Sequence, residues 1–117
     1  MQLNEMGFGE VKPVDGYGPG FFRVGGEVFE GAVLIGPAGV SAWGGLEDAA
    51  ALLALGDTVD VLLIGMGADI APLPRDLRVA LEAAGIAPEP MGSASAARTY
   101  NVLVSEGRRV AAALLPV

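Results

Sequence analysis

An unbroken apolar run near the C-terminus, Val110–Leu115, constrains the fold more than any other part of the sequence. Neither face of a strand formed by this run would carry a polar side chain. Such a strand belongs in the middle of a sheet that is covered on both sides. Helix is the alternative, because the run contains three alanines and alanine is the best helix former. However, Arg109 and Pro116 bound the run, which leaves it short for a helix and typical of a strand.

Length and composition limit the kinds of site that the chain can hold. The 117 residues are close to the commonest domain size, so we expect a single domain over residues 1–117. The sequence has no cysteine and no histidine. Disulfides, thiolate nucleophiles, imidazole bases and nearly all zinc, haem and iron–sulfur sites are therefore excluded. We expect no metal and no cofactor.

The charge and hydropathy of the chain indicate a soluble protein. Fourteen acids against seven bases give a net charge of −7, which argues against a nucleic-acid partner or an anionic membrane. No window approaches the roughly 20 uninterrupted apolar residues that a membrane span needs. The N-terminus lacks the basic start and apolar core of a secretory signal. These features, with the absence of cysteine, predict a cytoplasmic protein.

The first part of the chain is rich in glycine. Residues 1–20 also contain two prolines, so we expect irregular or extended chain on the surface, held by Phe8, Val11, Val14 and Tyr17. A hairpin signal follows. Two alternating segments, Phe21–Val24 and Glu27–Glu30, flank Gly25-Gly26, and a two-residue glycine turn suits the primed turns of β-hairpins.

The remaining chain alternates between strand and helix patterns. We expect strands at Ala32–Ile35, Val40–Trp43, Val59–Ile64 and Pro88–Met91, and helices at Leu46–Leu55, at 74–84 and from Ser93 to about Glu106. The alternation after residue 59 implies parallel strands joined by crossover helices. The prolines of Pro88–Met91 place that strand at an edge. The short link after the last helix favours a final strand that runs antiparallel to its predecessor.

The last predicted helix has two distinct faces. Ala96, Ala97, Tyr100, Leu103 and Val104 share an apolar face, and we expect the Tyr100 hydroxyl to lie at the rim of the core. A polar stripe contains Arg98, Asn101 and Ser105. Ser93 is a good N-cap residue for this helix.

Two loops form the candidate ligand site. In open α/β sheets ligands bind beyond the carboxyl ends of parallel strands, where Gly65-Met66-Gly67 and the loop before Ser93 would meet. The helix that begins there offers backbone N–H groups to an anion, and Arg98 offers a planar fork, with Asn101 on the same stripe. The alternative is that the glycines and Ser93 only turn and cap the chain, and that Arg98 pairs with an acid.

The sequence offers no catalytic residue. No two acids are held at a fixed spacing, so acid–base catalysis has no support. Trp43 lies on a strand with one wet face. It is a candidate anchor for a protein partner, and a structural role in covering the rim of the core is an equal alternative.

Several motifs resemble one family: Tyr17–Phe21, Gly36-Pro37, Trp43, Ile64–Gly67, Met91, Ala97–Leu103 and Glu106–Ala112. It is the domain-of-unknown-function family that includes the mitochondrial NADH dehydrogenase (complex I) assembly factor number three and an adipogenesis-associated animal protein. The resemblance covers nearly the whole chain. It implies an α/β, three-layer architecture, in which helices and a small N-terminal β-hairpin flank a mixed five-stranded sheet. It also implies that the C-terminal strand is in the middle of that sheet and antiparallel to the others.

Two positions depart from the family pattern. Relatives tend to have Gly-Thr-Gly where this chain has Gly65-Met66-Gly67, which removes a hydroxyl. They tend to have Met-Asp-Thr where this chain has Met91-Gly92-Ser93, which removes a carboxylate. If either group performs chemistry in relatives, this chain is a poor candidate for the same chemistry.

Two functional hypotheses follow. The first, implied by the resemblance, is a non-enzymatic binding or assembly module that presents an apolar, tryptophan-bearing surface to a subunit of a membrane complex, with homo-oligomerisation left open. The second is a binder or enzyme for a small anionic ligand at the Gly65 and Ser93 loops. We favour the first because the chain lacks histidine, cysteine and paired acids.

Overall fold

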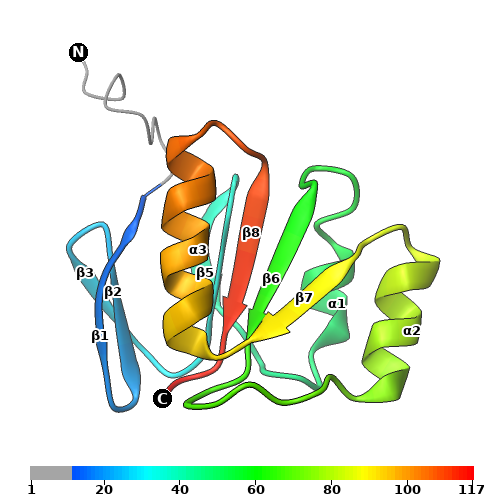
Figure 1. Cartoon of the computed structure of the whole chain (residues 1–117), viewed down its shortest axis with the longest axis horizontal. Helices are drawn as coiled ribbons and strands as arrows, with labels where there is room; N and C mark the ends of the chain where they lie inside the picture. Colours follow the sequence, from blue (N-terminus) through cyan, green and yellow to red (C-terminus); the bar gives the residue numbers. More distant parts are fainter. Residues whose placement is uncertain (1–11) are drawn as a thin grey trace.

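Residues 12–117 are described by the structure, which is a computed structural model. The predictions for Phe8 and Val11 lie outside the described residues. Within them, the chain forms a three-stranded sheet, a five-stranded sheet and three helices (Figure 1).

The small sheet contains β1 (Val14–Gly18), β2 (Phe21–Val24) and β3 (Glu27–Glu30), in that order. The predicted hairpin is confirmed, since β2 pairs antiparallel with β3 and φ is positive at both turn glycines, 59° at Gly25 and 85° at Gly26. Of the irregular or extended chain predicted for residues 1–20, β1 is extended. This strand pairs with β2, and the glycines that resembled loop residues lie inside a short strand with a bulge near its start.

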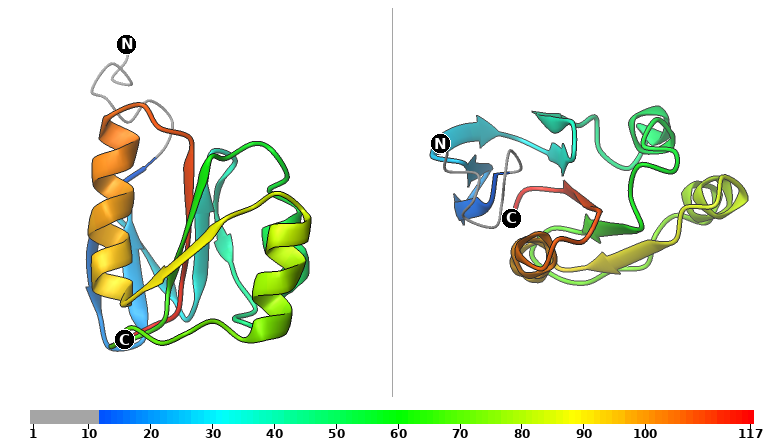
Figure 2. Two further views of the ribbon diagram at one scale, coloured as in Figure 1. Left: turned by 45° about the vertical axis from the view of Figure 1, so that its right-hand side comes forward. Right: turned by 90° about the horizontal axis from the view of Figure 1, so that it is seen from above.

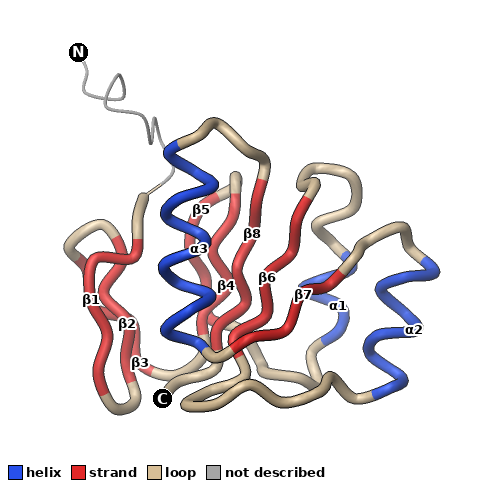
Figure 3. The backbone as a smooth tube through the Cα atoms, in the orientation of Figure 1, coloured by secondary structure: helices blue, strands red, loops and turns tan. Residues whose placement is uncertain are grey.

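The large sheet has the strand order β5-β4-β8-β6-β7 (Figure 3). Its strands are β4 (Val33–Gly36), β5 (Gly39–Ala42), β6 (Val61–Gly65), β7 (Pro88–Met91) and β8 (Val110–Leu114). The predicted central position of the C-terminal strand is confirmed, and every residue of β8 is buried. The proline-bearing strand β7 lies at an edge, as predicted.

The direction of β8 differs in part from the prediction. β8 is antiparallel to β4 but parallel to β6, and β6 is parallel to β7. The reason is the helix α3 (Ser93–Ser105), whose 13 residues span about 20 Å and carry the chain back along the sheet. The short link after α3 is therefore an ordinary loop of a parallel crossover, not a strand reversal.

Both faces of the large sheet are covered, which gives the three layers that the family resemblance implies (Figure 2). On one face α3 and the small sheet pack against it. On the other face lie α1 (Ala49–Leu53) and α2 (Arg75–Ala83). The side chains of β8 alternate between the two cores: Val110, Ala112 and Leu114 join the first, and Ala111 and Ala113 join the second.

The first helix is shorter than predicted, because it begins at Ala49 and not at Leu46. The Asp48 side chain is the reason. One carboxylate oxygen accepts a hydrogen bond from the N–H of Ala51 at 3.3 Å, and the other accepts from the N–H of Gly44 at 3.1 Å. Asp48 therefore acts as the N-cap residue of α1 and ties the helix start to the preceding turn.

Candidate functional site

The two predicted ligand loops lie side by side at the carboxyl ends of β6 and β7, as the parallel pairing of these strands requires. The N–H of Met66 donates to the carbonyl of Met91 at 2.8 Å, and the N–H of Ser93 donates to the carbonyl of Gly67 at 2.8 Å. The N–H groups of Met66 and Ser93, which an anion at these loops could otherwise bind, are thus paired within the protein. The loops close on themselves.

Ser93 is fully buried between these loops and the C-terminal segment. Its Oγ accepts a hydrogen bond from the N–H of Gly67 at 2.9 Å and donates one to the carbonyl of Leu115 at 2.6 Å. The prediction that Ser93 is the N-cap residue was wrong. Gly92 occupies the cap position without a side-chain bond, and Ser93 is the first residue of α3. Its hydroxyl joins three chain segments.

Gly65 allows these segments to approach closely. A Cβ atom at this position would lie 2.6 Å from the Oγ and 2.8 Å from the Cα of Ser93. Since the Cα belongs to the backbone, no side-chain rotation relieves that contact. The neighbouring carbonyl of Gly65 accepts a hydrogen bond from the N–H of Leu115 at 2.9 Å. The space at the carboxyl ends of β6 and β7 is therefore filled by Gly65, Ser93 and Leu115.

The two predicted residues on α3 have separate roles. Arg98 is exposed, and no hydrogen bond or ion pair joins it to another residue in the range 12–117. The side chain of Asn101 is engaged with the backbone of Val14 in β1. Asn101 therefore supports the small sheet, a role that its place on the polar stripe does not reveal.

Surface cavities lie elsewhere in the described part of the chain. One of about 350 Å³ separates the small sheet from the β4–β5 hairpin, and one of about 200 Å³ lies beside β5 near Leu55. A third, of about 540 Å³, lies between the segment that leads into α1 and the start of α2. None of these three is lined by the predicted ligand residues Gly65, Met66, Gly67, Ser93, Arg98 and Asn101.

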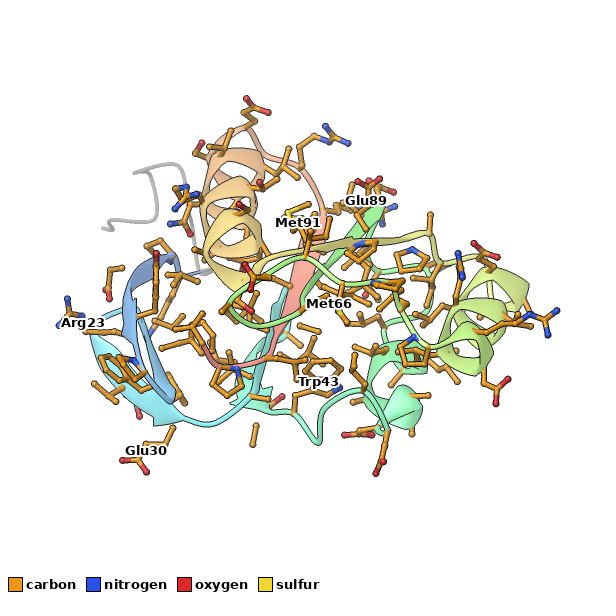
Figure 4. All side chains as sticks on the ribbon, turned by 60° about the horizontal axis from the view of Figure 1, so that its bottom comes forward. Arg23, Glu30, Trp43, Met66, Glu89 and Met91 are labelled. Atoms are coloured by element: carbon orange, nitrogen blue, oxygen red, sulfur yellow. The ribbon has the colours of Figure 1, made fainter. Side chains whose placement is uncertain are left out.

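The Trp43 side chain is buried, with 5% of its surface exposed. It belongs to the core on the α1 and α2 face, against which Met66 also packs (Figure 4). Its Nε1 donates to the carbonyl of Asp48 at 3.3 Å. The expectation of a wet-faced, partner-anchoring tryptophan is thus not met, because α1 folds over the side chain. Of the two roles considered, the structural one fits its burial.

Tyr100 lies deeper than predicted. Its hydroxyl is buried and has no hydrogen-bond partner among the described residues, so it is not at the rim of the core. Burial raises the pKa of Tyr100 above its ordinary value, because the phenolate would lose its hydration.

The two ion pairs among residues 12–117 are at the surface. Arg23 pairs with Asp15 at 2.9 Å and Arg109 with Asp60 at 2.6 Å. The hydrogen bond from Arg109 holds the pKa of Asp60 below its ordinary value. Arg23 points outward from the small sheet (Figure 4). Neither pair touches the predicted ligand loops, and no group of three or more acidic, histidine or cysteine side chains gathers in this part of the chain.

Comparison with known proteins identifies the family. Residues 14–115 match the family described as protein of unknown function (DUF498/DUF598). The chain belongs to this family. The match begins at β1 and ends just after β8, so it includes every strand and helix of the fold. The resemblance found in the motifs is thereby confirmed.

Two relatives illustrate the range of the DUF498/DUF598 family. An uncharacterized protein of Rhodobacter capsulatus is 59% identical over 117 residues, which cover all of this chain and 94% of that protein. NADH dehydrogenase [ubiquinone] 1 alpha subcomplex assembly factor 3 of Danio rerio is 30% identical over 107 residues. The aligned part covers 86% of this chain and 62% of the fish protein.

A solved structure shares the DUF498/DUF598 fold. It is described as an outer membrane protein from Bartonella henselae and superposes with a TM-score of 0.84 at 37% identity, covering 92% of this chain and 96% of that one. In residues 12–117 of the present chain, no helix has the length and hydropathy to cross a bilayer.

Proposed function

We propose that this DUF498/DUF598 chain is a binding module that attaches to another protein and assists its assembly, and that it is not an enzyme. The relative from Danio rerio, named as an assembly factor, supports a protein client. Its 30% identity makes that support distant. The proposal therefore depends mainly on the geometry at the carboxyl ends of β6 and β7.

The observation that carries the proposal is the engagement of the Ser93 hydroxyl. It bridges the N–H of Gly67 and the carbonyl of Leu115. Beside it, Gly65 lies so close to Ser93 that not even a methyl group would fit on Gly65. Ligands of open α/β sheets bind beyond the carboxyl ends of parallel strands. Here internal hydrogen bonds hold the loops at the carboxyl ends of β6 and β7 together. We therefore infer that a partner binds elsewhere on the outer surface.

The alternative, a small anionic ligand at the Gly65 and Ser93 loops, has less support. The N–H groups of Met66, Gly67 and Ser93 all donate within the protein. Arg98 is exposed and lines none of the three cavities described above. An anion at these loops would therefore meet the exposed guanidinium of Arg98 but no free N–H on Met66, Gly67 or Ser93.

The proposal is tested by purification from the organism that encodes the chain. We expect a tagged copy, crosslinked in the living cell, to co-purify with one protein in near-equal amount. Arg98→Ala is the matched variant, and it should retain the partner. Repeated recovery of the chain without any stoichiometric partner would contradict a binding function. Thermal stabilisation by an anionic metabolite that Arg98→Ala abolishes would favour the small-ligand alternative.

We also propose that the chain acts in the cytoplasm and as a monomer until it meets its client. The net charge of −7 supports the second point, since like-charged copies repel one another. Cell fractionation tests the location, and light scattering of the purified chain tests the oligomeric state. Recovery with the membrane fraction after high-salt washing would overturn the first point.

A further inference from the structure

We propose that the outer edge of β5 receives an extended segment of the partner protein as an additional strand of the large sheet. The inference deepens the proposed function, on which it rests, by naming where and how the partner binds. In strand addition, main-chain hydrogen bonds provide affinity and side-chain hollows on alternate sides provide specificity. The edge of β5 has both features.

The pairing of β4 with β5 determines which backbone groups face outward. The N–H of Trp43 donates to the carbonyl of Ala32, and Val33 pairs with Ala42 next to it. In an antiparallel ladder, hydrogen-bonded and non-hydrogen-bonded pairs alternate. Val40 and Ala42 therefore each belong to a non-hydrogen-bonded pair with a residue of β4, and the N–H and C=O of each point away from β4. No hydrogen bond within residues 12–117 reaches these groups.

The opposite edge of the sheet is protected, and the contrast is informative. At β7, the carbonyl of Met91 faces the β6 side, where it accepts from the N–H of Met66. Alternation places Pro88 and Pro90 outward, and proline has no N–H to offer. β5 has neither proline nor a charged residue, which are two of the devices that block an edge strand, although its four residues make it short. Of the two edges, only that of β5 can pair with another strand along its length.

Hollows flank β5 on both faces of the sheet. The cavity of about 350 Å³ lies on the face that carries the small sheet. Its lining combines apolar side chains with charged ones, namely Val40, Ile35, Phe29, Lys12 and Glu27. The cavity of about 200 Å³ is lined by Leu34, Ser41 and Leu55, on the face that carries α1. Because successive side chains of a strand point to opposite faces, an added strand would place alternate side chains into the two hollows.

The occupant that fits is a segment of another protein, with apolar side chains at successive positions and basic residues at its ends. The smaller hollow is lined mainly by apolar groups, and the larger one has apolar groups beside Lys12 and Glu27, so both accept apolar side chains. The chain carries a net charge of −7, so basic flanks are attracted to it. A second copy of this chain would bring the same negative charge to the interface and is disfavoured.

Proline substitution at Ala42 tests the edge with little other disturbance. Ala42→Pro removes one outward N–H, while the side chain is exposed and the N–H does not bond to β4. Ala42→Val is the matched control, because it keeps the N–H and favours a strand. The probe is a phage-displayed library of short linear peptides with lysine at both ends and random positions between. It is selected on the wild-type chain, and enriched peptides are then synthesised and titrated.

The expected result is a set of peptides with apolar residues along their centre. These should bind the wild type and Ala42→Val with similar affinity and Ala42→Pro at least about fivefold more weakly, because one hydrogen bond is lost. Amide exchange at Val40 and Ala42 should slow when the peptide is bound. A library without enriched sequences, or peptides that bind Ala42→Pro as tightly as the wild type, would overturn the inference. So would a dimer of this chain that Ala42→Pro dissociates.

The inference and the proposed function fail in different ways. If the cellular partner is captured equally by the wild type and by Ala42→Pro, the protein has a client but β5 does not bind it. If neither captures a partner, the binding function itself has failed. Both interpretations require that Ala42→Pro unfolds at a temperature near that of the wild type. If the proline variant does not fold, Ala42→Lys, which places a charge on the same edge, is used in its place.

Discussion

The side-chain amide of Asn101 on α3 pairs with the backbone of Val14 in β1 in both directions. The N–H of Val14 donates to Oδ1 of Asn101 at 2.9 Å, and Nδ2 of Asn101 donates to the carbonyl of Val14 at 2.7 Å. The two residues are 87 positions apart in the chain. The amide thus takes the place of a neighbouring strand and fastens the small sheet to the helix that covers the large one.

Asn101→Ala should destabilise the protein by about 1–3 kcal/mol. Val14 is buried, and the substitution leaves its N–H and carbonyl without their partners. The free energy of unfolding, measured by urea denaturation, tests the value. We also expect faster amide exchange in β1 than in β8.

Two variants separate the hydrogen bonds from the helix itself. Asn101→Asp keeps the acceptor for the Val14 N–H and loses the donor, so its cost should be intermediate. Ser105→Ala, one turn further along α3, removes an exposed hydroxyl that bonds only to the carbonyl of Val102. A loss in Asn101→Ala no larger than in Ser105→Ala would mean that the pairing does not stabilise the fold.

The parts of the fold that sequence predicts are those determined by burial. A run such as Val110–Leu115, apolar on both faces, has one favourable place in a sheet, and β8 occupies it. Gly25-Gly26 similarly determines a hairpin, because few other residues tolerate two positive φ angles. The direction of β8 was less predictable. It depends on the end of the sheet at which the chain re-enters after α3, and no local sequence pattern records this.

The roles of single polar residues were harder to predict. A serine at the start of a helix fits an N-cap, yet Ser93 bonds to Gly67 and Leu115, both distant in the chain. Asn101 and Arg98 share a polar stripe, but only Asn101 meets a backbone partner. The alternating pattern of Val40–Trp43 predicts one exposed face, but in the folded chain α1 covers Trp43. Each role is decided by tertiary contacts.

Ser93→Ala should cost about 1–3 kcal/mol of stability, although serine and alanine are similar in size. The substitution leaves the N–H of Gly67 and the carbonyl of Leu115 without the hydroxyl that joins them. Differential scanning calorimetry measures the change. Ser95→Ala is the control, since Ser95 is exposed in the same first turn of α3. Equal stability of the two variants would remove the bridging role of Ser93.

Trp43 provides a direct test of the second core. It is the only tryptophan in the sequence, so intrinsic fluorescence reports on this side chain alone. Because 5% of its surface is exposed, we expect blue-shifted emission and weak quenching by acrylamide in the native protein, both lost in urea. Emission of the native chain that resembles the urea-unfolded chain would show that α1 does not cover Trp43.

Tyr100→Phe should leave stability at neutral pH unchanged or raise it by up to about 1 kcal/mol. The hydroxyl is buried without a partner among the described residues, so its removal costs no hydrogen bond there. Urea denaturation at neutral pH measures this. A clear loss of stability would mean that a water molecule or another group satisfies the hydroxyl.

The same variant should change how stability depends on pH in the alkaline range. Burial raises the pKa of Tyr100 in the folded protein, whereas the unfolded chain releases the proton near the ordinary value of about 10. Below that value both states hold the proton, and the full stability is present. Above it only the unfolded state loses the proton, so the free energy of unfolding falls as pH rises towards the folded pKa. Tyr100→Phe removes this contribution and leaves every other titrating group in place. Urea titrations between about pH 9 and 11 should therefore show a shallower loss of stability in the variant, and equal slopes would contradict the burial of the hydroxyl.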